Sequence, residues 1–273
     1  MLLLVDLDGV VYRGATPVPG MAALLAAREA AGDTVIYVTN NSRWHRDEYH
    51  ARLEAMGVPV RQDRILTAAR ATALVLTEGG ARPLTMVLGG HGLARELREA
   101  GLRTVSPTQR GLAAEPEAVA VGVDFGLTYQ RLSTAAEAVR RGARFVATNR
   151  DPIYPSPDAL WAGAGSIVAA VATAGGRGPD LVVGKPEPRL FRAAAESVGE
   201  EPAKAVVIGD SLYSDIAAAN AIGARCVLML TGVTSREQAD LATASDASPQ
   251  PTAIAADPSE LAAVLERMAA EHP

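Results

Sequence analysis

Short apolar runs alternate along the chain with stretches in which apolar residues recur at the spacing of one helical face. Seven runs are rich in Val, Ile and Leu and end in glycine, proline or polar residues, which predicts strands. The predicted strands are residues 2–6, 34–39, 84–89, 118–123, 144–148, 205–210 and 225–230. Helices are predicted near 20–31, 45–56, 67–78, 91–100, 130–141, 164–174, 188–198 and 213–221.

Continuously apolar strands separated by helices are typical of a parallel sheet that is covered on both faces. We therefore predict an α/β protein with a Rossmann-like, doubly wound parallel-sheet core. The stretch from 79 to 179 has its own strand–helix alternation between two glycine-rich segments, which predicts an inserted smaller α/β domain. The core is then residues 1–78 and 180–273. A simple division of the chain into two halves is the alternative.

The composition limits the possible partners. The chain has 273 residues, a formal net charge of -5 and one cysteine, so it can bury a sizeable core without disulfides. Its mild acidity argues against general binding to nucleic acid or to anionic membranes. The apolar start lacks a basic segment and is interrupted at Asp6, unlike a signal peptide, and no apolar stretch is long enough to span a bilayer. We expect a cytoplasmic protein.

Polar residues follow the predicted strands at the edge where parallel α/β sheets bind ligands. Asp6 and Asp8 are two residues apart, so their carboxylates point the same way and repel each other unless a cation lies between them. Aspartates that cap a turn are the alternative. Thr39 and Asn40 offer a hydroxyl and backbone amides to a phosphate, or else they cap the following helix.

Two further groups lie in the C-terminal part of the chain. The prolines after Lys185 fix the entry to a helix, and a lysine held there can neutralise a phosphate, although a solvated loop lysine is the alternative. Asp210 ends a strand and Asp215 lies in the first turn of the next helix, where it binds a cation or caps that helix. Only two of the 26 basic residues are lysines, so a lysine at position 185 favours a specific role.

With these four groups in order, the chain resembles the haloacid dehalogenase (HAD) superfamily of aspartate-nucleophile phosphatases. The motifs of that superfamily are DxDG, a strand-end Thr or Ser, a Lys, and GDxxxxD. The phrases DGVVYRG, VTNNS, ATNRD and VGKPEP resemble class IIA capped enzymes of the p-nitrophenyl phosphatase, phosphoglycolate phosphatase and nucleotide-monophosphatase type. The resemblance implies Mg²⁺-dependent hydrolysis of small phosphate monoesters through an aspartyl-phosphate intermediate.

The same resemblance implies a role for each core residue. Asp6 is expected to attack phosphorus, and Asp8 to act as general acid and then as general base. Thr39 and the Asn40 amide are expected to hold the phosphoryl oxygens, and Lys185 to neutralise the phosphate and the nucleophile.

The resemblance also implies a Mg²⁺ site. Its expected ligands are Asp6, the backbone carbonyl of Asp8 and Asp210, with Asp215 either coordinating the ion or lying next to it.

The inserted domain is expected to contact the substrate through Asn149, Arg150 and Asp151, with Arg150 meeting an anionic group or else remaining solvated. His45 is expected to be exposed at the start of a helix. The expected partner is a small phosphorylated metabolite, and a homodimer is possible in this family.

Two alternatives to hydrolysis remain. One is a phosphotransferase or mutase of the same superfamily, and the other is a non-catalytic phosphate-sensing module. A receiver-like sensor needs only about 120 residues and no cap, which disfavours the second alternative.

Overall fold

The computed structural model describes residues 1–155, 159–244 and 249–271. Within it the chain divides into two compact units. The first unit contains Met1–Thr39, Tyr49–Leu66 and Lys185–Pro273, and the second contains Asn40–Glu48 and Thr67–Gly184. The predicted boundaries of an inserted domain at 79 and 179 stay a prediction. By packing, the second unit also includes the helix over 68–77 and the segment Asn40–Glu48, which comes directly after a strand of the first unit.

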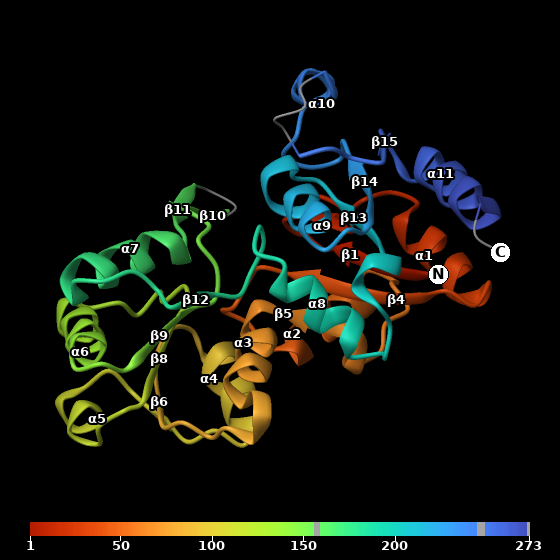
Figure 1. Cartoon of the computed structure of the whole chain (residues 1–273). Coiled ribbons are helices and arrows are strands. Elements are labelled where there is room, and N and C mark those ends of the chain that lie inside the picture. The colour runs from red at the N-terminus through yellow and green to blue at the C-terminus, as the bar shows by residue number, and fades with distance from the viewer. Residues whose placement is uncertain (156–158, 245–248, 272–273) are drawn as a thin grey trace. The chain divides into compact units, whose positions relative to one another are not determined.

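A six-stranded sheet forms the centre of the first unit, with the order β15-β14-β13-β1-β4-β5 (Figure 1). Its strands are β1 (Leu2–Asp6), β4 (Thr34–Thr39), β5 (Ile65–Thr67), β13 (Val206–Gly209), β14 (Arg225–Met229) and β15 (Ala253–Ala255). Strand β1 pairs in parallel with β4 and β13, so that Val5 lies opposite Tyr37 on one side and Ile208 on the other. Three neighbouring strands therefore end at the same edge.

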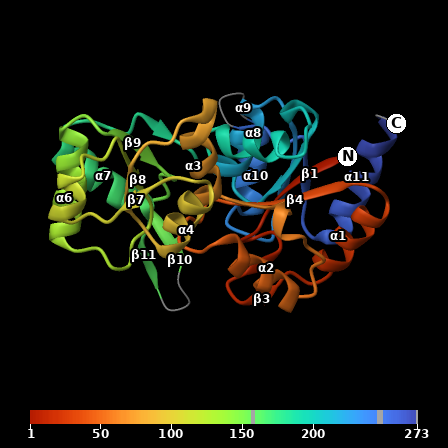
Figure 2. The same cartoon turned by 90° about the horizontal axis from the view of Figure 1, so that it is seen from below.

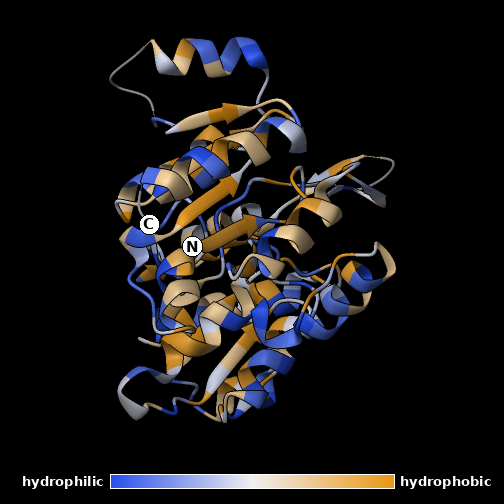
Figure 3. Cartoon of the chain, turned by 90° about the vertical axis from the view of Figure 1, so that its right-hand side faces the viewer, coloured by the Kyte–Doolittle hydropathy of each residue, from blue (hydrophilic) through white to orange (hydrophobic). Residues whose placement is uncertain are grey.

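Helices cover this sheet because its strands are largely apolar: β1 is apolar up to its final residue, Asp6, and is buried along its whole length, as the hydrophobic colour of the strands illustrates (Figure 3). Helix α8 packs against β1 and β4, α9 against β14, α1 against β4 and α11 against β15. The helices are α1 (Met21–Ala30), α2 (Arg46–Ala55), α8 (Arg189–Glu196), α9 (Ala217–Ala221), α10 (Arg236–Thr243) and α11 (Pro258–Glu271). Short elements complete the unit: the hairpin β2 (Tyr12–Arg13) and β3 (Thr16–Pro17), 3₁₀ turns at Gln62–Arg64 and Pro202–Lys204, and the π-helical turn η4 (Leu212–Ile216).

The second unit has its own parallel sheet of five strands, in the order β12-β9-β8-β6-β7. Figure 2 labels β9, β8 and β7 of this sheet. Met86, Val119 and Phe145 are fully buried in its core. The strands are β6 (Thr85–Leu88), β7 (Thr104–Val105), β8 (Ala118–Val121), β9 (Arg144–Ala147) and β12 (Leu181–Val182), with an antiparallel hairpin of β10 (Ile153–Pro155) and β11 (Leu160–Ala162). The helices are α3 (Ala68–Thr77), α4 (His91–Glu99), α5 (Gln109–Ala113), α6 (Tyr129–Arg140) and α7 (Ala164–Gly175), with a 3₁₀ turn at Glu78–Gly80.

The predicted α/β class and parallel sheets are confirmed. All seven predicted strands are present, most of them shorter by one or two residues. The helix predicted at 213–221 is the π turn η4 followed by α9. No helix in the described parts of the chain combines the length and apolarity that crossing a bilayer requires.

Helix α4 approaches the segment Asn40–Glu48 so closely that its second residue must be glycine. A Cβ on Gly92 would lie 2.2 Å from the carbonyl carbon of Trp44, and the Gly92 amide donates to the Arg43 carbonyl at 2.9 Å. At an unhindered helix position, replacing glycine with alanine stabilises the helix by about 1 kcal/mol. A destabilising effect of alanine at position 92 would therefore have to come from the clash.

We expect Gly92→Ala to lower the free energy of unfolding by about 1–3 kcal/mol in urea titrations, because backbone atoms must move apart. Gly178→Ala is the matched control, since a Cβ there meets no atom within 4 Å. The control should be neutral or slightly stabilising. Equal effects of the two substitutions would contradict the close approach.

Candidate active site

Three buried carboxylates gather at the edge where β1 and β13 end. Asp6 is the last residue of β1, Asp210 follows β13 directly, and Asp215 lies in η4. One oxygen from each carboxylate lies within 4.8 Å of the others. The three residues are between 1% and 6% exposed, so water does little to reduce their mutual repulsion. The group requires compensating positive charge.

Lys185 supplies part of that charge. Its ammonium donates to Asp6 Oδ1 at 2.5 Å and to Asp215 Oδ1 at 2.6 Å, and the residue is only 2% exposed. Lys185 is therefore a buried ion-pair partner of two aspartates, and the solvated loop lysine that the sequence left open is excluded. With one ammonium against three carboxylates, the site retains an excess of negative charge when all three are ionised.

Glycines make room for the carboxylates. A Cβ on Gly9 would lie 2.2 Å from Asp210 Oδ2, and one on Gly232 would lie 1.8 Å from the same oxygen. Gly9 also has a φ of +86°, a backbone angle that residues other than glycine rarely adopt. Gly232 lies in the loop after β14, and in that loop the Val233 amide donates to Asp210 Oδ2 at 2.7 Å. Sequence reasoning missed this loop, although its place after an apolar strand could have pointed to it.

Burial and mutual repulsion change the pKa values of these groups. Burial raises the pKa of Asp6 well above its ordinary value, and the Lys185 charge opposes this rise. Burial and the Asp215 carboxylate raise the pKa of Asp210 from 3.8 to about 7. Burial alone would lower the pKa of Lys185, but the Asp215 and Asp6 carboxylates raise it, so the ammonium stays charged. The raised pKa values of both Asp6 and Asp210 show that Lys185 alone does not compensate the negative charge of this group.

Asp8 and Thr39 lie at the same edge but in different surroundings. Asp8 is exposed and is not part of the carboxylate group, although its pKa is raised by desolvation and lowered again by the Arg52 guanidinium and a hydrogen bond from the Gly14 backbone. Thr39 is 7% exposed and ends β4, whose residue Val38 pairs with Asp6. The roles of Asp8 and Thr39 stay predictions.

The remaining predicted residues lie in the second unit. Asn40 Nδ2 donates to both carboxylate oxygens of Asp151, at 3.2 and 3.0 Å. Asn149 Nδ2 donates to the Asn40 carbonyl at 2.6 Å and is 4% exposed, whereas Arg150 is exposed. Asn40, Asn149 and Asp151 therefore form one hydrogen-bonded group, and Arg150 does not take part in it.

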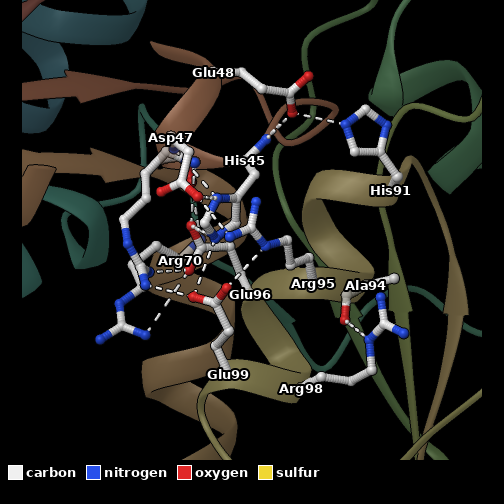
Figure 4. A network of polar contacts seen from close by, with 12 residues as sticks. His45, Asp47, Glu48, Arg70, His91, Ala94, Arg95, Glu96, Arg98 and Glu99 are labelled. Atoms are coloured by element: carbon white, nitrogen blue, oxygen red, sulfur yellow. Dashed lines mark hydrogen bonds and ion pairs between the residues drawn. The ribbon is translucent and has the colours of Figure 1, made fainter. Parts of the chain in front are cut away.

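A second polar group with metal-binding side chains also lies in this unit (Figure 4). His45 Nε2 lies 3.3 Å from Glu96 Oε1 and 3.2 Å from Glu99 Oε2, and the Asp47 amide donates to His45 Nδ1. The expectation of an exposed His45 was wrong: the residue is 1% exposed, because α4 supplies carboxylates that cover it.

Arginine side chains already compensate the negative charge of the two glutamates in this second group. Arg46 donates to both Glu96 and Glu99, and Arg70 lies 3.8 Å from Glu96. A metal ion at this place would have to compete with the guanidinium groups for the same carboxylate oxygens. We interpret this group as an ion-pair network that fastens the segment Asn40–Glu48 to α4.

The first carboxylate group, in contrast, fits a divalent cation. Asp6, Asp210 and Asp215 offer hard oxygen ligands, which Mg²⁺ prefers, and their negative charge exceeds that of Lys185. Burial and the neighbouring Asp215 carboxylate raise the pKa of Asp210, as expected where negative charge is not fully compensated. A divalent ion would compensate that charge.

Comparisons with known proteins agree with this chemistry. The model of a haloacid dehalogenase-like hydrolase family matches residues 3–103, and a HAD-hydrolase-like family model matches residues 182–261. Mouse chronophin is 38% identical over 245 residues, covering 87% of this chain and 83% of chronophin.

Two solved structures are similar along nearly the whole chain. The p-nitrophenyl phosphatase from Archaeoglobus fulgidus superposes with a TM-score of 0.88 at 33% identity, covering 96% of this chain and 98% of that one. A glycerol phosphate phosphatase from Mycobacterium tuberculosis in complex with magnesium gives a TM-score of 0.85 at 35% identity, covering 95% and 75%.

The pKa of Asp210 predicts how stability depends on pH in the metal-free protein. A carboxyl whose pKa is higher in the folded chain binds protons more tightly there, so its contribution to the free energy of unfolding falls as pH rises from about 4 to about 7. Asparagine does not titrate. In EDTA, Asp210→Asn should therefore become more stable than the wild type as pH rises, by about 1–4 kcal/mol at pH 8.

Urea unfolding at several pH values measures this difference. The gap between variant and wild type should close near pH 4, and Mg²⁺ should stabilise the wild type more than the variant. A gap that is the same at every pH would contradict the raised pKa of Asp210.

Proposed function

The chain belongs to the haloacid dehalogenase-like hydrolase family, and we propose that it is a Mg²⁺-dependent phosphatase that hydrolyses small phosphate monoesters through an aspartyl-phosphate. The observation that carries this proposal is the buried group in which Lys185 joins Asp6 and Asp215 while Asp210 completes the set of carboxylates. With a divalent cation offsetting its excess negative charge, such a site would bind a phosphate dianion and present a carboxylate to it.

In the first step, a carboxylate oxygen of Asp6 forms a bond to phosphorus, and the bond from phosphorus to the ester oxygen breaks. Asp8 donates its proton to that leaving oxygen, so the product is a neutral alcohol. The desolvation that raises the pKa of Asp8 favours the protonated form that this step needs. Thr39 and the Asn40 amide hold the phosphoryl oxygens.

In the second step, Asp8 accepts a proton from a water molecule that attacks the phosphorus of the aspartyl-phosphate. The bond between phosphorus and the Asp6 oxygen breaks, which releases inorganic phosphate and restores the carboxylate. Lys185 keeps its charge throughout and holds the Asp6 carboxylate in place through the 2.5 Å contact. Asp6, the Asp8 carbonyl and Asp210, with Asp215 beside them, would hold Mg²⁺, which when bound would supply the positive charge that reduces the repulsion between an anionic nucleophile and an anionic phosphate.

The substrate class follows from the relatives. The solved relatives are named for p-nitrophenyl phosphate and glycerol phosphate, both small monoesters. A screen of phosphoglycolate, glycerol phosphates, sugar phosphates and nucleoside monophosphates, with and without Mg²⁺, identifies the preferred ester by phosphate release. A cytoplasmic location, a homodimer and a contact between Arg150 and an anionic substrate group stay predictions.

We expect Asp6→Asn to lower phosphate release from p-nitrophenyl phosphate by about 10⁴-fold or more, since an amide is not a nucleophile. The fold should persist, because asparagine has the same shape and Lys185 keeps Asp215 as a partner. Circular dichroism and the melting temperature check the fold. Substantial turnover by a folded variant would refute the proposed nucleophile.

Lys185→Arg tests whether the site needs a compact ammonium. A planar guanidinium does not fit the space between two carboxylates that lie 2.5 and 2.6 Å from Nζ, so we expect a loss of about 100-fold in kcat. Lys204→Arg is the control, because Lys204 is exposed and pairs with Glu201 on one helical turn. The control should keep its full rate, and a near-normal rate for Lys185→Arg would remove the argument from lysine shape.

A further inference from the structure

We propose that Asn149 and Asp151 are positioning residues that hold Asn40, in place of contacting the substrate themselves. The inference rests on the proposed function, in which the Asn40 amide holds a phosphoryl oxygen. All three residues belong to the second unit, so their contacts are internal to one compact body.

The hydrogen bonds among the three residues form a closed ring. The Asn40 side-chain amide donates to both oxygens of Asp151, at 3.0 and 3.2 Å. The Asn40 carbonyl accepts from Asn149 Nδ2 at 2.6 Å, and the Asp151 amide donates to Asn149 Oδ1 at 3.0 Å. Because both the side chain and the carbonyl of Asn40 are held, its backbone torsions are restricted, and the direction of its N–H is set.

The backbone at Gly184 also packs closely against the Asn40 side chain. A Cβ on Gly184 would lie 2.6 Å from Asn40 Oδ1 and 2.7 Å from the Thr148 carbonyl, which accepts from the Gly184 amide at 2.8 Å. Asn40 follows Thr39 directly in the chain, and Gly184 directly precedes Lys185. One small region of the second unit therefore fixes the two chain positions next to Thr39 and Lys185.

Neighbouring contacts strengthen the same attachment. Thr148 Oγ1 donates to Ser42 Oγ at 3.0 Å, and both residues are fully buried. The far end of the same segment is fastened by the ion pairs of His45 and its neighbours with α4 (Figure 4). Other residues of the second unit thus hold the segment Asn40–Glu48 at both of its ends.

Charge also argues against a direct substrate contact by Asp151. A carboxylate repels a phosphate monoester, which is an anion, whereas it is a good acceptor for the amide of Asn40. Asn149 is 4% exposed, and its donor and acceptor groups already bond to Asn40 and Asp151. These side chains act on the reaction by pre-orienting Asn40.

A double-mutant cycle with Asp151→Ala and Asn40→Ala tests this role. Asn40→Ala keeps the backbone N–H but removes the side chain through which Asp151 acts. For each protein we would measure kcat and KM with p-nitrophenyl phosphate, and the inhibition constant of inorganic phosphate. We expect Asp151→Ala to lower kcat/KM by about 10-fold and to weaken phosphate binding by a similar factor, since small misplacements at such sites have large effects.

Coupling is the decisive readout. If Asp151 acts through Asn40, the double variant should be no worse than either single variant within about 2-fold. Asp151→Asn should retain part of the activity, because one acceptor oxygen remains. Asp124→Ala is the control for a purely structural loss, since Asp124 is a buried aspartate of the same unit that pairs with Arg131. This control should lower the melting temperature without changing the inhibition constant of phosphate.

Losses that multiply in the double variant would overturn the inference, as would an Asp151→Ala protein with unchanged phosphate inhibition but altered substrate preference. A wild-type protein that releases phosphate from no ester would instead refute the proposed function. The two failures are therefore distinguishable.

Discussion

The site depends on the balance of charge among groups that the sheet buries. Three aspartates meet at one edge, and a single ammonium, that of Lys185, bridges two of them. Burial and mutual repulsion raise the pKa of Asp6 well above its ordinary value and that of Asp210 to about 7, so the single ammonium does not offset the charge of all three carboxylates. The same imbalance that would destabilise a purely structural protein suits an enzyme that must bring a divalent cation and a phosphate dianion to one place.

The arrangement of the chain explains how this site is held. Strand β1 lies between β4 and β13, so the parallel sheet alone brings Asp6, Thr39 and Asp210 to one edge. Glycines at 9 and 232 then allow the backbone to close around the Asp210 carboxylate. The chain passes into the second unit directly after Thr39 and returns directly before Lys185. Within the second unit, hydrogen bonds hold Asn40 and Gly184, the residues next to these two positions in the chain.

Local patterns predicted most of the fold. Strands such as Leu2–Asp6 are apolar up to their final residue, and the parallel class follows from that property. Strands β7 and β12 were missed because each has two residues and owes its strand geometry to the neighbour it pairs with. The motifs pointed to Asp6, Lys185, Asp210 and Asp215, which the structure brings together, whereas Asp8 lies outside their carboxylate group. Contacts between distant residues were not predictable: Glu96 and Glu99 reach the buried His45 from α4, and Asn40 is held by Asp151, 111 residues further along.

The covalent intermediate on Asp6 is the central claim of this account. It is tested most directly by quenching the enzyme in acid during turnover of p-nitrophenyl phosphate with Mg²⁺ and locating the phosphoryl group by mass spectrometry of peptides. The account predicts a phosphoryl group on the peptide that contains Asp6, absent when Mg²⁺ is removed by EDTA. A phosphoryl group on another residue, or rapid turnover with no phosphorylated peptide, would contradict it.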